Sequence, residues 1–187
     1  MSQGVVEMLE EIKDLPQKVV ENLDGDQENI KIYLVQDFNL ALLRRIVNFE
    51  LDIFSEQGID EWGLVPQIRH GNVFILKEEN KKKIIGIAIL MRDWEEFDKA
   101  YLFDYAIADE FQGQGLGYHF LHSICLNIKE QGFNKMDLTV NTENPAAIHL
   151  YKDKLGFKII KMSEDEFGKG HHRYVMELDL STLKLLN

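Results

Sequence analysis

The chain has 187 residues, of which 45% are apolar and 28% are charged, as expected for one globular domain with a substantial core. Its 32 acidic and 21 basic residues give a formal net charge of −11, which argues against a nucleic-acid-binding surface, because such surfaces need clustered Lys and Arg. Its single cysteine excludes an intramolecular disulfide. We expect a cytoplasmic protein, because no apolar run is long enough to span a membrane and the first residues lack a secretory-signal pattern.

The first 29 residues form a segment of their own. Apolar residues from Val5 to Ile12 recur at helical spacing, which favours an amphipathic helix, and Pro16 interrupts the pattern. The sequence therefore predicts a helical leader over 1–29 and a second region over 30–187.

The next elements are a strand, a helix and a loop. Residues 31–35 (Lys-Ile-Tyr-Leu-Val) are mostly apolar and predict a strand, after which Asp37 is placed to cap a helix that ends at Gly58. The segment 62–71 carries Pro66 and is predicted to be a loop.

A meander of strands follows and leads to a glycine-rich segment. Residues 73–76 and 84–90 flank a charged turn and predict a hairpin, and 101–107 predicts a third successive strand. Residues 112–117 then precede an amphipathic helix that ends at Gly132.

The last part of the chain alternates strands and helices. A strand over 136–140, a helix over 144–151 and strands over 157–160 and 173–180 are predicted. A meander followed by this alternation predicts a mixed α/β (α+β) fold, with a central, mostly antiparallel sheet of six to seven strands flanked by helices.

Three glycines, Gly113, Gly115 and Gly117, lie between a predicted strand and a helix start. Glycine lets the backbone approach a ligand closely, and amides at a helix N-terminus attract phosphate, so the segment is a candidate diphosphate site. The spacing G-x-G-x-G differs from the dinucleotide fingerprint and lacks the Lys-Ser/Thr of a triphosphate loop. A nucleotide-binding domain is an alternative, which the preceding hairpins disfavour.

Two motifs resemble those of one family. Gln112-x-x-Gly115-x-Gly117 is similar to the Q/R-x-x-G-x-G/A signature of the GNAT superfamily of acyl-CoA N-acyltransferases, and Asn144, Tyr151 and 155–157 (Leu-Gly-Phe) resemble its second signature. The resemblance covers about residues 31–180. It implies a GNAT-like fold and direct transfer of acetyl from the cosubstrate acetyl-CoA to an amine in a ternary complex.

The resemblance also implies roles for individual residues. The loop that would hold the CoA diphosphate comprises Gln112, Gly113, Gln114, Gly115, Leu116, Gly117 and Tyr118. Backbone groups of Ala106, Ile107 and Ala108, on a strand separated from its neighbour, and the Asn144 side chain would bind the pantetheine arm and the acetyl carbonyl. Tyr151 would be the general acid for the departing thiolate, a role that suits a phenol because its pKa exceeds that of a thiol.

The general base is a separate question. Relatives that acetylate protein N-termini often carry Glu in the middle of the fifth strand, where this sequence has Thr139. Asp104, on the strand before the glycine segment, is the first candidate, and Asp137 and Glu143 are weaker ones. Each also fits a structural carboxylate.

The identity of the acceptor leaves alternatives open. The acidic balance favours a small cationic amine; the alternatives are a protein N-terminus, as in ribosomal-protein acetyltransferases, or a non-catalytic acyl-CoA-binding regulatory module. No metal site is expected, since the adjacent His171 and His172 would point in opposite directions on an extended chain. No membrane partner is expected, and exposed edge strands favour a homodimer.

Overall fold

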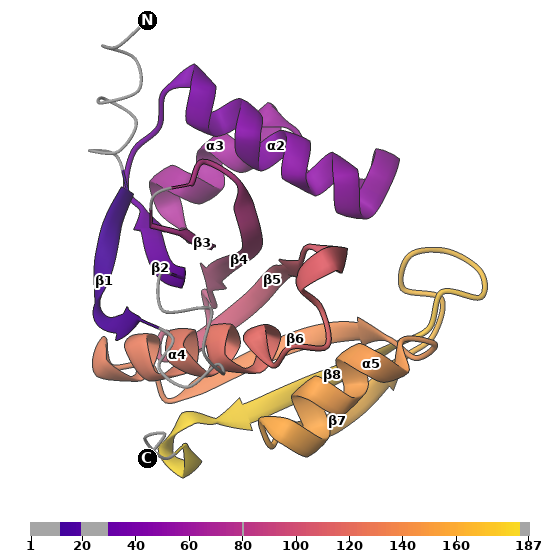
Figure 1. Cartoon of the computed structure of the whole chain (residues 1–187). Helices are drawn as coiled ribbons and strands as arrows, with labels where there is room; N and C mark the ends of the chain where they lie inside the picture. The colour runs from indigo at the N-terminus through magenta and orange to yellow at the C-terminus, as the bar shows by residue number, and fades with distance from the viewer. Residues whose placement is uncertain (1–11, 20–29, 80, 184–187) are drawn as a thin grey trace, which may run out of the picture. The chain divides into compact units, whose positions relative to one another are not determined.

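The computed structural model describes residues 12–19, 30–79 and 81–183 (Figure 1). The chain divides into two compact units: the first holds residues 1–91 and 104–120, and the second holds residues 92–103 and 121–187. Strand β5 (Lys99–Ile107) and helix α4 (Leu116–Glu130) each have residues in both units. No helix in the described part is both long and apolar enough to cross a bilayer.

The first unit is built on antiparallel strands that are neighbours in chain order. These strands are β1 (Ile12–Val19), β2 (Ile30–Val35), β3 (Asn72–Glu78) and β4 (Ile84–Arg92). Its helices are α2 (Leu40–Phe54) and α3 (Glu61–His70), with short 3-10 turns at Ser55–Gln57 and Asp109–Phe111. The predicted hairpin is thereby confirmed as β3 and β4.

The core of the first unit lies between the strands and the two helices. Successive residues of a strand point to opposite faces, and Val73 and Ile75 of β3 pack in one cluster with buried residues of α2 and α3, such as Ile46 and Leu64. Phe74, on the opposite face of β3, is also fully buried. Burial of both faces explains why β3 and β4 are almost continuously apolar rather than alternating.

Helix α2 is capped by Asn39 and not by Asp37, so the predicted cap is corrected by two residues. The Asn39 side chain accepts hydrogen bonds from the amides of Ala41 and Leu42, each at 3.0 Å. These are the second and third amides of a helix that begins at Leu40, and an N-cap side chain satisfies those amides. Asp37 instead accepts from the amide of Phe38.

The predicted loop over residues 62–71 is wrong, because helix α3 occupies most of it. Asp60 caps this helix by accepting from the amide of Gly63 at 2.9 Å. Leu64 and Ile68, four residues apart, are buried in the core. Pro66 lies inside the helix and removes one helical hydrogen bond, a loss that packing by two core side chains offsets.

The helical prediction for the leader is wrong over residues 12–19, which form strand β1. This strand pairs with β2, and its register is irregular between Asp14 and Val19. Pro16 falls in that irregular stretch, where a residue without an N–H is tolerated in a strand. The rest of the leader lies outside the described residues, and a boundary at residue 30 stays a prediction.

The second unit contains the start of β5 and three further strands. These are β6 (Lys135–Asn141), β7 (Lys158–Ser163) and β8 (Arg173–Asp179), in the order β5-β6-β8-β7. The β5–β6 pair is parallel, whereas β6–β8 and β7–β8 are antiparallel. All seven predicted strands are present, in addition to β1, and the prediction of a mixed, mostly antiparallel α+β fold is confirmed. Helix α5 (Pro145–Ile148) continues as a π-helix over His149–Lys154, and Leu180–Thr182 form a 3-10 turn.

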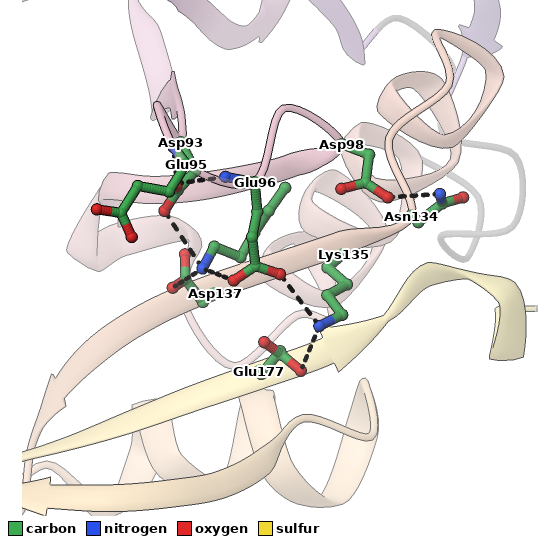
Figure 2. Close-up of polar contacts among 9 residues, drawn as sticks. Asp93, Glu95, Glu96, Asp98, Asn134, Lys135, Asp137 and Glu177 are labelled. Carbon is green, nitrogen blue, oxygen red and sulfur yellow. Dashed lines mark hydrogen bonds and ion pairs between the residues drawn. The ribbon is translucent and has the colours of Figure 1, made fainter.

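A network of ion pairs joins the starts of β5 and β6 (Figure 2). Lys99, whose side chain is 12% exposed, contacts Glu96 at 2.7 Å and Asp93 at 3.2 Å, and lies 3.8 Å from Asp137. The hydrogen bond to Glu96 is the main cause that raises the pKa of Lys99. Lys135 extends the network to Glu96, so the network ties the turn before β5 to the next strand of the second unit.

Cys125 is fully buried in the second unit. Its Sγ lies 3.8 Å from the Sδ of Met136 on β6, and burial raises the pKa of the thiol. A buried, protonated thiol is a packing group and not a nucleophile.

Candidate active site

The glycine segment forms a tight turn into helix α4. Gly113 and Gly115 have φ of 73° and 80°, in the left-handed region that favours glycine. The helix begins directly afterwards at Leu116, whose side chain is fully buried. The turn therefore leads into the N-terminus of a 15-residue helix, where the first backbone amides have no helical partner and attract anions.

Side-chain hydrogen bonds hold this turn against the end of β5. The Gln112 Nε2 donates to the carbonyl of Ile107 and to Asp109, both at 2.9 Å. The hydroxyl of Tyr105 donates to the carbonyl of Gly117. The Gln112 side chain thus orders the loop, and contact of its backbone amide with a ligand stays a prediction.

The predicted pantetheine site at the end of β5 is buried. Ala106, Ile107 and Ala108 are each less than 10% exposed. The amide of Ala108 donates to the carbonyl of Ile85 at 2.8 Å, so this amide and the Ile107 carbonyl already have partners. The parallel register of β5 and β6 ends with the pair Leu102 and Leu138; a separation of the strands beyond it, and the role of the other backbone groups, stay predictions.

The structure brings Asp104 together with a second carboxyl, that of Glu50. Glu50 lies on the stripe of α2 that also carries Ile46 and is fully buried. Asp104 is half-buried on β5, and Ala106, which shares its strand face at the period of two, packs in the same core cluster as Ile46. Both carboxyl groups therefore face the space between α2 and the end of β5, within the first unit.

Each of the two carboxyl groups shifts the pKa of the other. Burial, followed by the neighbouring Asp104, raises the pKa of Glu50 to about 9. Burial also raises the pKa of Asp104, while Glu50 and the amide of Tyr105 act in the opposite direction. Glu50 consequently keeps its proton at neutral pH, and the negative charge of the pair resides on the less buried Asp104.

The surroundings of Glu50 in the described part of the chain offer little to balance a charge. Neither of its carboxyl oxygens has a hydrogen-bond partner of normal geometry within the described part of the chain. Asp104 and the amide of Ile59 act on it electrostatically. A fully buried carboxylate in that position would be costly, which is consistent with the protonated form.

The second signature lies in the second unit. The Asn144 Oδ1 caps α5 by accepting from the amide of Ala147 at 3.0 Å. Tyr151 is buried in the π-helix, a geometry found often at functional sites. Its ring packs on that of Phe157 with centroids 5.8 Å apart, which explains why the Leu-Gly-Phe triplet accompanies the tyrosine. The ligand and acid roles of Asn144 and Tyr151 stay predictions.

The position of the missing strand glutamate is filled by a small polar residue. The Thr139 Oγ1 lies 3.4 Å from the hydroxyl of Tyr101, and its carbonyl accepts from Arg173 at 3.1 Å. Asp137, a weaker candidate for the base, lies 3.8 Å from Lys99, and burial raises its pKa; its role as a base stays a prediction. Glu143 makes its described contact through its amide, which donates to the Asn141 side chain at 2.9 Å.

Glu50 is the residue that the sequence analysis missed. Its position four residues after Ile46 and four before Phe54, both in the core cluster, is a signal that the sequence contains. A carboxyl on the apolar stripe of a helix must find a partner or remain protonated. The partner, Asp104, is 54 positions away in the chain, and only the fold reveals it.

Comparison with known proteins agrees with these motifs. The family model described as "Acetyltransferase (GNAT) family" matches residues 41–157. The chain is 33% identical over 94 residues to the [ribosomal protein bS18]-alanine N-acetyltransferase of Haemophilus influenzae, covering 50% of this chain. It is 27% identical over 108 residues to the N-terminal acetyltransferase A complex catalytic subunit ard1 of Schizosaccharomyces pombe, covering 56% of this chain. The chain spans 61% of the length of each of these two relatives.

A solved structure shows the same fold. The ribosomal-protein-S18-alanine N-acetyltransferase of Escherichia coli superposes with a TM-score of 0.65 at 23% identity, covering 83% of this chain and 99% of that one. At this identity the likeness shows the fold, and the predicted GNAT-like fold is thereby confirmed.

Proposed function

Because the chain belongs to the acetyltransferase (GNAT) family, we propose that it transfers an acetyl group from acetyl-CoA to a primary amine. The observation that carries the proposal is the glycine turn of 112–117, with two residues in the left-handed region, at the N-terminus of α4. Such a turn offers several amides to a diphosphate. Acetyl-CoA, whose diphosphate would bind there, supplies the acetyl thioester.

The chemistry requires a proton acceptor and a proton donor. An ammonium acceptor gives one proton to the Asp104 carboxylate, and the resulting amine attacks the thioester carbonyl. The C–N bond forms, the nitrogen of the tetrahedral intermediate loses its second proton to solvent, and the C–S bond breaks. The thiolate takes a proton from Tyr151, which recovers one from solvent. Asp104 then releases its proton to solvent, so the sum is ammonium and acetyl-CoA to amide, free CoA and one proton.

The acceptor we favour is a small cationic amine. The chain carries a formal charge of −11, which favours encounter with cations, and the half-buried Asp104 carries the charge of its pair. Thr139 in place of the strand glutamate agrees with this choice. The second candidate is the α-amine of a protein N-terminus, which the names of the two relatives favour.

The cofactor is tested by calorimetric titration with acetyl-CoA, CoA, NAD and ATP. We expect binding of acetyl-CoA and CoA to wild type and its loss in Gly115→Glu, because the added carboxylate repels the diphosphate. Gly170→Glu is the matched control: Gly170 has a φ of 87°, close to that of Gly115, and lies in another loop. Undiminished affinity in Gly115→Glu would refute the diphosphate site, and binding of NAD or ATP alone would refute acetyl-CoA as its ligand.

The acceptor is tested by release of free CoA with a polyamine, an amino acid, an aminoglycoside and a peptide that begins with alanine. Turnover with the small amines only would support the first candidate, and turnover with the peptide only would support the second. Binding of acetyl-CoA without transfer to any amine would favour the non-catalytic module. Sedimentation of the same preparation tests the predicted homodimer.

A further inference from the structure

We propose that Glu50 and Asp104 act as one carboxyl pair with a single negative charge, in which Glu50 keeps the proton and, as a positioning residue, holds Asp104 ready to receive the proton of an ammonium acceptor. This inference rests on the proposed function and deepens it, because it assigns the form in which the acceptor binds: a protonated amine that replaces bulk water as the partner of the Asp104 carboxylate.

Glu50 lies at an unusual position for a carboxyl group. It occupies the core stripe of α2, where its neighbours at one helical turn are Ile46, Val47, Ile53 and Phe54. It is fully buried, and neither oxygen has a hydrogen-bond partner of normal geometry within the described part. A glutamate in that setting destabilises the fold relative to an apolar residue, so packing does not explain its presence.

The direction of Asp104 follows from its place on β5. The odd-numbered neighbours Phe103 and Tyr105 lie on one strand face, and Asp104 lies on the other with Ala106. Ala106 and Ala108 belong to the cluster that contains the core residues of α2. Asp104 is therefore on the face that α2 covers, two residues before the buried strand end and eight before the glycine turn at Gln112.

No cation balances the pair among the described residues. Asp104 and the amide of Ile59 are the groups that act on Glu50, and Glu50 and the amide of Tyr105 are those that act on Asp104. The helices contribute no counter-ion among the described residues: on α2, Arg44 and Asp52 are exposed and Arg45 is half-buried, and on α3, Glu61, Arg69 and His70 are exposed. Two carboxyls without a cation cannot both ionise readily, so one proton stays within the pair.

The difference in burial decides where the proton sits. Glu50 is fully buried, whereas Asp104 is half-buried, and the charged form prefers the more solvated position. The resulting carboxylate of Asp104 faces a neutral acid and is the more solvent-exposed member of the pair. An ammonium group is the complement of this arrangement, and its approach supplies the cation that the described residues do not provide.

The experiment begins with the free protein and requires no turnover. Side-chain carboxyl carbons are labelled with 13C and followed by NMR from pH 4 to pH 10. We expect the Glu50 signal to titrate at least two pH units above the exposed glutamates, and Asp104→Asn to lower the Glu50 midpoint by about one unit or more. Asp52→Asn, which removes an exposed carboxyl from the same helix, is the matched control and leaves the Glu50 midpoint in place. A Glu50 signal that titrates with the exposed glutamates overturns the proposal.

Steady-state kinetics then test the carboxyl pair independently of the proposed acetyl transfer. Glu50→Leu removes the acid that lowers the pKa of Asp104, so the acid limb of the kcat/KM profile moves to higher pH by about one unit. Glu50→Gln keeps a neutral donor and restores the wild-type limb. Transfer with identical profiles in all three proteins overturns the pair and leaves the acetyltransferase intact. A coupled titration without transfer to any amine supports the pair and refutes the proposed function.

Discussion

Replacement of Glu50 by glutamine should make the free energy of unfolding less sensitive to rising pH. Glu50 has its pKa raised from an ordinary value near 4.5 to about 9, so between those values the unfolded chain releases a proton that the folded chain retains. A group of this kind lowers the free energy of unfolding as pH rises, and the loss begins near the unfolded pKa. Glutamine has no proton to release.

The magnitude follows from the width of the pH interval. From pH 4.5 to pH 7 the folded chain keeps the Glu50 proton throughout, and each pH unit changes the free energy of unfolding by about 1.4 kcal/mol. The wild type should therefore lose about 3 kcal/mol over this interval relative to Glu50→Gln. Contributions from all other groups, Asp104 included, largely cancel because both proteins contain them.

The assay is denaturant-induced unfolding of the ligand-free proteins at half-unit steps from pH 4.5 to pH 7. The difference in unfolding free energy between Glu50→Gln and wild type should widen steadily in favour of the variant. Asp52→Asn should run parallel to wild type, since its carboxyl faces solvent in the folded chain. A constant difference between Glu50→Gln and wild type would show that Glu50 ionises normally in the fold and would refute the reasoning.

Three further predictions concern other parts of the chain. Tyr151→Phe should lower turnover by about a hundredfold or more, as for loss of a general acid, with acetyl-CoA affinity by calorimetry unchanged; unaltered turnover would remove Tyr151 from the acid role. Lys99→Met should lower the free energy of unfolding, measured with denaturant, by about 1–3 kcal/mol, because Asp93, Glu96 and Asp137 lose their shared cation. Lys135→Met, at a more exposed position, should lower it by less than about 1 kcal/mol. Equal losses in the two variants would contradict a central role for Lys99 in the network. Gly86→Ala should cost about 1–3 kcal/mol by the same measurement, because its Cβ would lie 2.6 Å from the Ile107 Cδ1 and 3.0 Å from the Ala106 carbonyl; an unchanged stability would show that the strand end yields.

The local pattern of apolar and polar residues was sufficient to predict most of the strands and helices. The seven predicted strands have strong β-branched or apolar runs, and α4 has a broad apolar stripe, so local preference and packing agree. Helix α3 was missed because its stripe consists of Leu64 and Ile68 alone, and Pro66 and Gly63 indicate a break. Strand β1 was missed because its identity depends on pairing with β2, a tertiary interaction that overrides local periodicity.

Site residues that belong to local motifs were predicted from the sequence, whereas those that depend on tertiary contacts were not. The glycine turn and Tyr151 were found because each belongs to a motif of fixed spacing. Asp104 was chosen by its place on a strand, and the structure adds a neighbour that alters its chemistry. Glu50 comes from a helix 54 positions earlier in the chain than Asp104, and its effect depends on burial and on the lack of a nearby counter-ion among the described residues, neither of which a sequence window reports.

Burial of the only cysteine makes its reaction with a thiol reagent a measure of local opening of the fold. In the folded chain Cys125 is fully enclosed beside Met136, so a thiol reagent reaches it only when α4 parts from β6 in the second unit. Under native conditions the labelling rate therefore measures the free energy of that opening event, residue-specifically and without denaturant. The same enclosure keeps Cys125 from reacting when a thiol-reactive dye counts released CoA, so the dye reports turnover without a signal from the folded protein.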